Sequence, residues 1–201
     1  KGDICEVPLT LMYLFGIRRS EALGLKLDAI DFENGSISIR HTVVPVKGSL
    51  LCKDITKTKK SRRTLPLIPG TEEYIKKVVE KVQGLQALFG PKFNPQGYIC
   101  INNDGSLIYP TTVTKHNSIV LEKAGLPAYR LHDSRHSVAS LLVANGCNMK
   151  EIQLWLGHSD IATTGNLYSH LGTDGLKNAS EKISSKISLP ISDDVFEPIA
   201  S

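Results

Sequence analysis

The feature that most constrains the fold is a β-rich block between Ile30 and Pro69 that interrupts an otherwise helical pattern. Apolar residues alternate at Ile37 and Ile39 after the turn Glu33-Asn34-Gly35. The pattern continues through Thr42–Val44, Leu50–Ile55 and Thr64–Ile68. A period of two between helical flanks suggests a small antiparallel sheet. We expect a mainly α fold with one small antiparallel β-sheet, which is an α+β architecture.

Helical patterns lie on both sides of this block. The first covers Val7–Gly16, with Pro8 near its first turn and Gly16 as its stop. A second short helix is predicted at Ser20–Leu23. After the block, helices are predicted at Thr71–Gln83, Thr111–Lys123, Asp133–Ala144, Met149–Leu156 and Ile161–Tyr168, with one short strand at Tyr98–Ile101. Near the end, Leu176, Ala179, Ile183 and Ile187 form an apolar stripe at helical spacing.

Composition excludes several classes of protein. The 201 residues are 41% hydrophobic, which suits a globular chain of one domain or one domain plus an extension. The apolar run Val7–Ile17 is too short to span a bilayer. The four cysteines lie far apart, without a C-x-x-C pair, so we expect no zinc ribbon and reduced thiols in a cytoplasmic protein.

Basic residues are concentrated in one place, although the net charge is only +4. The dense segment contains Lys57, Lys59, Lys60, Arg62 and Arg63, on the predicted turn between the last two strands of the sheet. Two interpretations remain open at this point: a site for a polyanion such as nucleic acid, or a solvated basic loop.

Several single residues have both a chemical and an ordinary interpretation. His132 and His136 share a helix face and imitate the H-E-x-x-H zinc motif. Asp133 is shorter than the glutamate of that motif and Arg135 adds a cation, so zinc hydrolysis is disfavoured and His136 is expected to be structural. Taken singly, Arg18 is a surface residue or a partner of Glu21. His158 is a carbonyl cap, and Tyr168 is a packing residue.

Taken together and in order, these motifs resemble the tyrosine recombinase (phage integrase) family. The blocks are G-I-R-R-S-E-A-L at 16–23, T-K-T-K-K-S-R-R-T-L-P-L at 56–67, L-H-D-S-R-H at 131–136, W-L-G-H at 155–158 and T-T-G-N-L-Y-S-H at 163–170. The resemblance runs from about Leu9 to Leu171. The motif sequences are most similar to those of integrases of conjugative transposons and phages of Gram-positive bacteria. It implies the catalytic-domain fold of that family.

The resemblance also implies a mechanism and a set of catalytic residues. Tyr168 attacks a DNA phosphate and forms a 3′-phosphotyrosine link. Arg18 and Arg135 clamp the phosphate, His132 accepts a proton and His158 bonds the phosphate. Lys57 is the general acid for the leaving 5′-oxygen, with Lys59 as its rival. Neither a metal, a cofactor nor ATP is implied.

Other charged residues are assigned by the same resemblance. Glu21 is expected to be a buried structural partner, and the G-x-R-x-S-E pattern selects Arg18 rather than Arg19. Candidates for DNA contacts are Lys59, Lys60, Arg62, Arg63, Lys115 and Arg130, with solvated surface charge as the alternative for each.

The expected organisation is a catalytic domain at 1–171, a helix at 172–188 and a loose tail at 189–201. The helix packs on its own core or docks on a neighbouring protomer. The family's N-terminal core-binding and arm-binding domains are expected to be absent. Partners would be double-stranded DNA, three further copies in a tetramer on DNA (a monomer when free) and accessory DNA-bending or excision factors. The alternatives are a type IB topoisomerase or resolvase, and a non-catalytic DNA-binding regulatory module.

Overall fold

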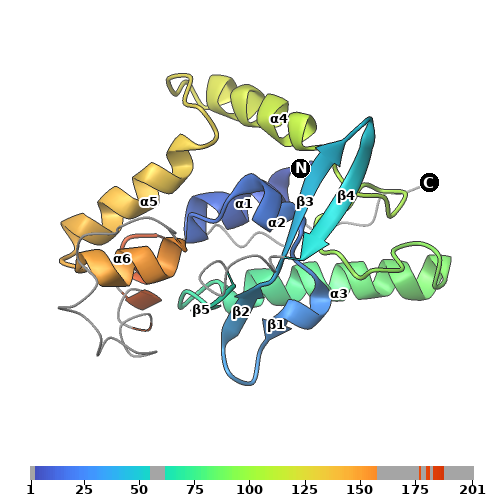
Figure 1. The fold of residues 1–201 in the computed structure, drawn as a ribbon, viewed down its shortest axis with the longest axis horizontal. Helices are drawn as coiled ribbons and strands as arrows, with labels where there is room; N and C mark the ends of the chain where they lie inside the picture. The colour runs from blue at the N-terminus through green and yellow to red at the C-terminus, as the bar shows by residue number, and fades with distance from the viewer. Residues whose placement is uncertain (1–2, 55–61, 158–176, 178–179, 182, 188–201) are drawn as a thin grey trace.

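The structure, a computed structural model, describes residues 3–54, 62–157, 177, 180–181 and 183–187 (Figure 1). Its helices are α1 (Glu6–Phe15), α2 (Arg19–Leu23), the 3₁₀ turn η1 (Leu27–Ala29), α3 (Glu72–Phe89), α4 (Pro110–Lys123), α5 (Asp133–Ala144) and α6 (Met149–Leu156). Its strands are β1 (Ile30–Asp31), β2 (Ser36–Ile39), β3 (His41–Val46), β4 (Ser49–Asp54) and β5 (Arg63–Pro66). The mainly helical fold with antiparallel strands is therefore confirmed.

The helices begin and end close to their predicted positions because their signals are local. Pro110 occupies the first turn of α4, where its missing N–H costs little. Asn148 caps α6 by accepting hydrogen bonds from the backbone of Lys150 and Glu151, and the Glu151 side chain accepts one in return from the Asn148 backbone. The exception is α3, which continues past Gln83 through Gly84 and ends at Gly90. Its apolar face stays packed as far as Val82, and one glycine costs too little to end it.

The prediction of a single sheet was wrong, because the strands form two sheets. One has the order β1-β2-β5, and the other pairs β3 with β4. Strands β2 and β3 follow one another through Arg40. As β2 runs forward, it pairs with residues that run backward from Pro66 to Arg63. As β3 runs forward, it pairs with residues that run backward from Asp54 to Ser49. An alternating pattern fixes which face of a strand is buried but not which strand it pairs with.

This change of partner relocates the basic segment. It does not lie at the tip of a hairpin formed by β4 and β5, because these strands belong to different sheets. Residues 55–62 instead connect the end of one pairing to the start of the next. The tip of the β3–β4 hairpin is Lys47-Gly48, where positive φ angles of 47° and 82° match a tight two-residue turn. Tyr109, just before α4, donates a hydrogen bond from its hydroxyl to the Gly48 carbonyl at 2.6 Å.

The short strand predicted at Tyr98–Ile101 is also absent as a strand. The segment makes two isolated bridges instead, one between Tyr98 and Lys26 and one between Ile101 and Leu107. Its apolar residues are buried for another reason, since Tyr98, Ile99 and Cys100 all belong to the core.

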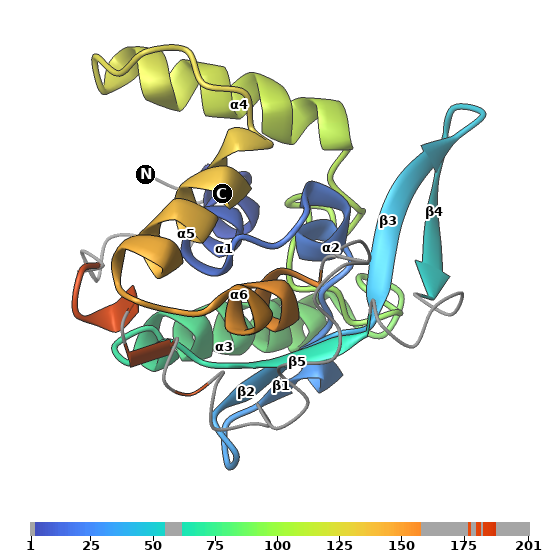
Figure 2. The same cartoon turned by 60° about the vertical axis from the view of Figure 1, so that its left-hand side comes forward.

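The core centres on α1, which packs against α2, α4 and α5, while α6 lies over β5 (Figure 2). Trp155 of α6 is fully buried and closes this core. Its ring stacks on Phe15 with centroids 6.4 Å apart, and its Nε1 donates a hydrogen bond to the Phe15 carbonyl at 2.9 Å. One side chain therefore fixes α6 to the carboxyl end of α1.

The described residues after position 176 lie against the body of the chain. Ser180 donates a hydrogen bond to the Leu67 carbonyl and Ser184 one to the Pro69 carbonyl, each at 2.8 Å. Ile183 is buried in the core. Ile183 and Ile187, the two described residues of the stripe, thus pack on their own chain, while Leu176 and Ala179 lie outside the described residues. Docking on a neighbouring protomer stays a prediction, as do the domain boundaries. Among the described helices, none combines the length and the apolar character needed to cross a membrane.

We predict that Trp155→Phe lowers the free energy of unfolding by about 1–3 kcal/mol, because the buried Phe15 carbonyl loses its donor. Trp155→Ala should cost about 3–5 kcal/mol through the cavity that it leaves. Urea unfolding followed by far-UV circular dichroism measures both values. Leu88→Ala, at a side chain 74% exposed, is the control and should change stability by less than about 0.5 kcal/mol. Equal effects at Trp155 and Leu88 would contradict this account of the core.

Candidate functional site

Three of the predicted catalytic residues line one cavity. Arg18 precedes α2, His132 precedes α5 and Arg135 lies in the first turn of α5. The cavity has a volume of about 260 Å³. Its walls are formed by Met12, Ile17, Arg18, Arg19, Thr114, Leu131, His132, Ser134 and Arg135. The tertiary structure therefore brings together motifs that lie more than a hundred residues apart in the sequence.

Two glycines that end helices form the backbone turns beside this site. Gly16 follows α1 with φ of 63°, and Gly157 follows α6 with φ of 67°. Both are left-handed conformations that glycine adopts without a Cβ penalty. Each turn leads into a predicted catalytic residue, because Arg18 comes two residues after Gly16 and His158 comes directly after Gly157. The Gly16 turn therefore sets the position of Arg18, whereas His158 lies outside the described residues.

The arginines tie these two turns together. Arg135 donates a hydrogen bond from Nη1 to the Gly16 carbonyl at 2.8 Å, and another from Nη2 to the Leu156 carbonyl. Arg18 donates from Nη2 to the Gly157 carbonyl at 3.3 Å. Carbonyls left without partners at helix ends thus accept hydrogen bonds from guanidinium groups. The ends of α1 and α6 are held at fixed positions around the cavity.

Arg135 is only 3% exposed. Burial, and then the positive charge of Arg18, lowers the pKa of Arg135 to about 10. The guanidinium therefore remains charged at neutral pH. A buried cation beside a second cation is a favourable place for an anion, since the anion relieves their repulsion.

Glu21 is the anion already present, and it is 2% exposed. It accepts hydrogen bonds at 2.8 Å from both the backbone N and the Nη1 of Arg18. Arg63 donates to it from Nη1 at 3.2 Å and from Nη2 at 3.0 Å. Burial alone would raise the pKa of Glu21, but the hydrogen bonds and charges of Arg63 and Arg18 hold it below its ordinary value. Glu21 is thus the buried partner that the sequence predicted, with one more arginine than expected.

Arg63 corrects the sequence analysis, which placed it among the DNA contacts. Its side chain is 6% exposed and forms an ion pair with Glu21. Its Nε also donates a hydrogen bond to the Trp155 carbonyl at 2.8 Å. A signal for this was present in the sequence, because Arg63 lies two residues before buried Leu65 and therefore shares the inward face of the strand.

His132 and His136 share a helix face as predicted, with ring centroids 5.3 Å apart in an edge-on contact. Both are exposed, so the expectation that His136 is a satisfied structural histidine was wrong. Arg19, which the motif pattern set aside, also lines the cavity. It donates hydrogen bonds to the Pro110 carbonyl at 3.1 Å and to the Thr114 hydroxyl, which fixes α2 to α4.

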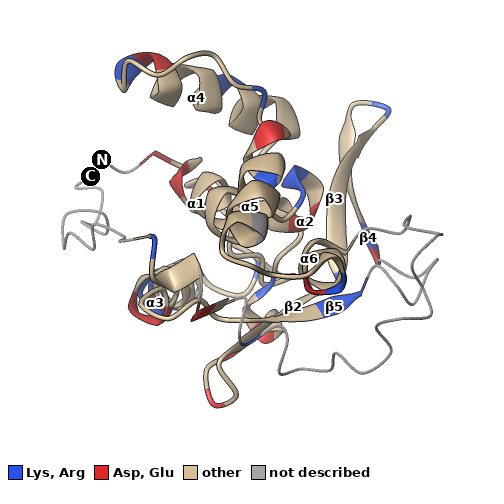
Figure 3. Cartoon of the chain, turned by 90° about the vertical axis from the view of Figure 1, so that its left-hand side faces the viewer, with Lys and Arg blue, Asp and Glu red and all other residues tan. Residues whose placement is uncertain are grey.

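The remaining predicted residues divide into two groups. Arg62, Lys115 and Arg130 are exposed, so their side chains are accessible to a partner. Basic positions on α2, α5 and β5 lie around α6 on the same side of the molecule (Figure 3). Lys57, Lys59, Lys60, His158 and Tyr168 lie outside the described residues, and their roles stay predictions.

The potential metal ligands that cluster in the described part of the chain lie elsewhere. Asp3, Cys5 and His116 offer ligand atoms within 4.8 Å of one another. The Asp3 carboxylate accepts a hydrogen bond from the Cys5 backbone at 2.8 Å and pairs with His116 Nδ1 at 2.7 Å. These contacts are those of an aspartate turn just before α1 and of an ion pair that joins this turn to α4.

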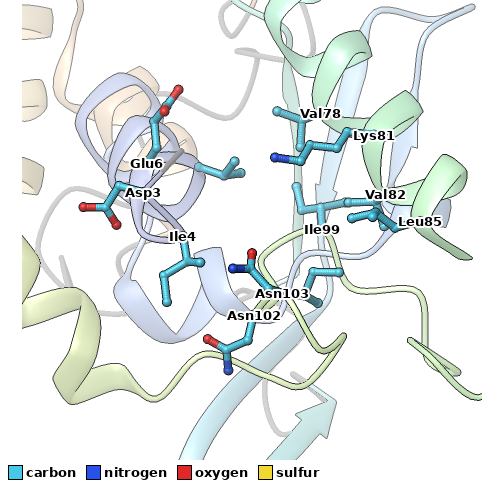
Figure 4. A pocket seen from close by; sticks show the side chains of 12 residues that line it. Asp3, Ile4, Glu6, Val78, Lys81, Val82, Leu85, Ile99, Asn102 and Asn103 are labelled. Carbon is cyan, nitrogen blue, oxygen red and sulfur yellow. The ribbon is translucent and has the colours of Figure 1, made fainter. Parts of the chain in front are cut away.

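A second cavity, of about 70 Å³, lies between the start of α1 and α3 (Figure 4). Asp3 and Glu6 lie on one wall and Lys81 on the facing wall, while Val78, Val82 and Ile99 supply apolar surface. Burial raises the pKa of Glu6, and the charge of Lys81 opposes that rise. This cavity shares no lining residue with the arginine-lined one, so we do not assign it to the same site.

The Glu21 ion pairs predict a defined dependence of stability on pH. The folded pKa of Glu21 is depressed, so its contribution is complete above the unfolded value of about 4.5 and is lost as pH falls through the folded value. Near neutral pH, Glu21→Gln should cost about 3 kcal/mol, because Arg63 is left buried without its anion. The gap between wild type and variant should narrow below about pH 4.5. Urea unfolding across pH measures this gap, and a constant gap down to about pH 3 would contradict the assignment.

Known sequences resemble the chain over most of its length. Residues 6–174 match the model of the phage integrase family. A tyrosine recombinase XerC-like protein of Caldanaerobacter subterraneus subsp. tengcongensis is 30% identical over 91% of the chain and 50% of its own length. The transposase of transposon Tn916 from Enterococcus faecalis is 28% identical over 79% of the chain and 40% of its own length. The chain thus spans about half the length of the curated relatives it matches.

Several solved structures have the same fold as this chain. The Tn1549 transposon integrase in complex with transposon right end DNA superposes with a TM-score of 0.66 at 22% identity, over 85% of the chain and 56% of that protein. The XerA recombinase superposes with a TM-score of 0.56 at 21% identity, over 88% of the chain and 55% of that protein. The architecture in Figure 1 is therefore shared with these proteins.

Proposed function

The chain belongs to the phage integrase family of tyrosine recombinases, and from this membership we propose that it catalyses site-specific DNA recombination. The reaction is the integration or excision of a mobile element by transesterification. The observation that carries the proposal is the cavity in which Arg18, His132 and Arg135 meet. Two guanidinium groups and an imidazole around one cavity suit a phosphodiester better than a neutral or cationic substrate.

The proposed reaction needs no external energy source. The Tyr168 oxygen attacks phosphorus, the bond from phosphorus to the 5′-oxygen breaks, and a 3′-phosphotyrosine forms. His132 takes the phenolic proton, and Lys57 gives a proton to the leaving 5′-oxygen. Attack by the 5′-hydroxyl of another strand reverses these steps and joins a new pair of ends. The covalent link conserves the phosphodiester bond, so ATP is not consumed.

The arginines act on the transition state. Negative charge grows on the non-bridging oxygens as the phosphorus becomes pentavalent, and fixed cations stabilise it more than they stabilise the ground state. Burial of Arg135 and its hydrogen bonds to two carbonyls fix its position in advance. We propose that His158, the residue directly after Gly157 in the sequence, bonds the same phosphate.

The partners follow from the same proposal. The transposon DNA in the matched Tn1549 integrase structure supports DNA as the substrate, and we propose that this DNA is double-stranded. Strand exchange between two sites needs four active centres, so we propose a tetramer on DNA that forms from monomers, assisted by accessory DNA-bending factors. Docking of residues 172–188 on a neighbouring copy would join these subunits. A cytoplasmic location is proposed because the substrate is DNA and the four cysteines are free thiols.

The decisive experiment is covalent trapping. We expect the full-length protein, mixed with a suicide attachment-site substrate and a chelator, to form a protein–DNA adduct that denaturing electrophoresis resolves. Tyr168→Phe should form none while it binds DNA normally, because the nucleophile is lost but the cations remain. Normal binding without an adduct in the wild type would favour a regulatory DNA-binding module instead. Relaxation of supercoiled DNA without exchange between sites would favour a type IB topoisomerase.

The phosphate clamp makes a separate prediction. Arg18→Gln and Arg135→Gln should each slow adduct formation by about 10²–10³-fold, because each variant removes a preorganised donor to the transition state. Single-turnover cleavage at saturating DNA measures this rate. Thr112→Ala, on α4 and outside the cavity lining, is a control that should cleave at the wild-type rate. Equal rates in all three variants would remove these arginines from the mechanism.

Binding of the DNA backbone predicts a salt effect. Lys115→Gln and Arg130→Gln change exposed cations, so each should reduce the slope of the logarithm of the binding constant against the logarithm of salt concentration by about one. The measurement is fluorescence anisotropy with labelled duplex at several salt concentrations. A variant that leaves the slope unchanged identifies a solvated charge at that position rather than a phosphate contact.

A further inference from the structure

Arg63 links three of the segments that carry proposed catalytic residues, those of Arg18, His158 and Lys57, and this is a role that the motif alone did not assign. The first link is to the segment of Arg18. The Arg63 guanidinium grips both oxygens of Glu21, and the other bonds of Glu21 go to the backbone and side chain of Arg18. Arg63 and Arg18 therefore share one buried carboxylate, and a movement of either group disturbs the other.

The second link is to the segment of His158. The Arg63 Nε donates to the Trp155 carbonyl in the last turn of α6. The guanidinium also lies directly on Gly157, where an added Cβ would come within 2.7 Å of Nη1 and 3.0 Å of Cδ. Gly157 thus meets two requirements, a left-handed backbone and room for the arginine. The residue that follows it is His158.

The third link is through the chain itself. Arg63 is the first residue of β5, immediately after the basic segment that contains Lys57. Its pairing with Ile39 fixes the backbone at this point. The position at which the basic segment rejoins the fold is therefore tied to α2 and to the end of α6.

We propose that Arg63 is a positioning residue, which holds Arg18, the Gly157 turn that precedes His158 and the start of β5 that follows the lysine-bearing segment in register for catalysis, and does not contact DNA. The proposal rests on the proposed function. Its chemistry is the bidentate geometry of a guanidinium, which holds two carboxylate oxygens and a carbonyl at once and which the point charge of a lysine does not reproduce. Unlike Arg135, Arg63 does not line the cavity, and its Nε, Nη1 and Nη2 all bond to Trp155 or Glu21, so its donors are directed at these partners and not at a phosphate.

The experiment compares Arg63→Lys and Arg63→Gln with the wild type in the full-length protein. We expect single-turnover adduct formation at saturating DNA to slow on the order of 100-fold in both variants, because the reacting groups are misplaced. The dissociation constant for duplex DNA and its salt slope should stay as in the wild type. Arg63→Lys keeps the positive charge but not the geometry of the guanidinium. If it cleaves as slowly as Arg63→Gln, the geometry of the guanidinium is required and the charge alone is not sufficient. A lysine variant that cleaves at the wild-type rate would overturn the proposal.

Two further variants provide contrast. Arg62→Gln changes the exposed neighbour and should weaken DNA binding and reduce the salt slope, which Arg63 variants should not do. Lys77→Gln removes one cation from an exposed ion pair on α3 and should leave both cleavage and binding unchanged. If the Arg63 variants reduce the salt dependence of the DNA-binding constant as Arg62→Gln does, Arg63 contacts phosphate and the proposal is wrong.

Gly157→Ala decides the question if the Arg63 variants do not fold. It keeps every charge but pushes a methyl group against the guanidinium. Slow cleavage with normal DNA binding supports positioning, and cleavage at the wild-type rate overturns it. These outcomes differ from failure of the proposed function, in which the wild type itself forms no adduct.

Discussion

Burial of the Glu21 carboxylate is the constraint on which the rest of the site depends. A carboxylate that is 2% exposed is stable only with cations and donors around it, because its loss of hydration is not otherwise recovered. One cation comes from Arg18, three residues earlier, and the other from Arg63, the first residue of β5. The charge requirement of a single side chain thus fixes a short helix against a strand.

The ends of α1 and α6 extend this framework. Each ends in a left-handed glycine, and arginines from other segments donate to the carbonyls at these ends. In this way Arg135 from α5 and Arg18 from the start of α2 approach each other in spite of their like charges. The burial of Arg135, which lowers its pKa, is compatible with such an arrangement because the carbonyl dipoles replace part of its hydration. The result is a cavity lined by two arginines whose positions are fixed by hydrogen bonds to backbone carbonyls.

The split of the sheet matters for the same site. Had β4 and β5 formed a hairpin, the basic segment would have been its tip, remote from α6. The change of partner at Arg40 instead makes this segment start at Asp54 and return at Arg63, beside the end of α6. The lysine-bearing segment is thereby anchored at its second end to the same ion-pair network as Arg18. The β3–β4 hairpin is left to reach α4 through Tyr109 and Gly48.

The sequence by itself determined the helices at Glu6–Phe15, Asp133–Ala144 and Met149–Leu156, because caps, stop glycines and helical periodicity act within a few residues. It also determined the order of the motifs and hence the family. Only the tertiary structure decided which strands pair, and which arginines line the cavity and which bond to Glu21, as Arg18 does both. The alternation of buried and exposed residues along a strand is the same whichever other strand it pairs with. The partner of a guanidinium depends on groups distant in the chain, 42 residues away for Arg63 with Glu21 and 139 for Arg18 with Gly157, and no local pattern encodes that encounter.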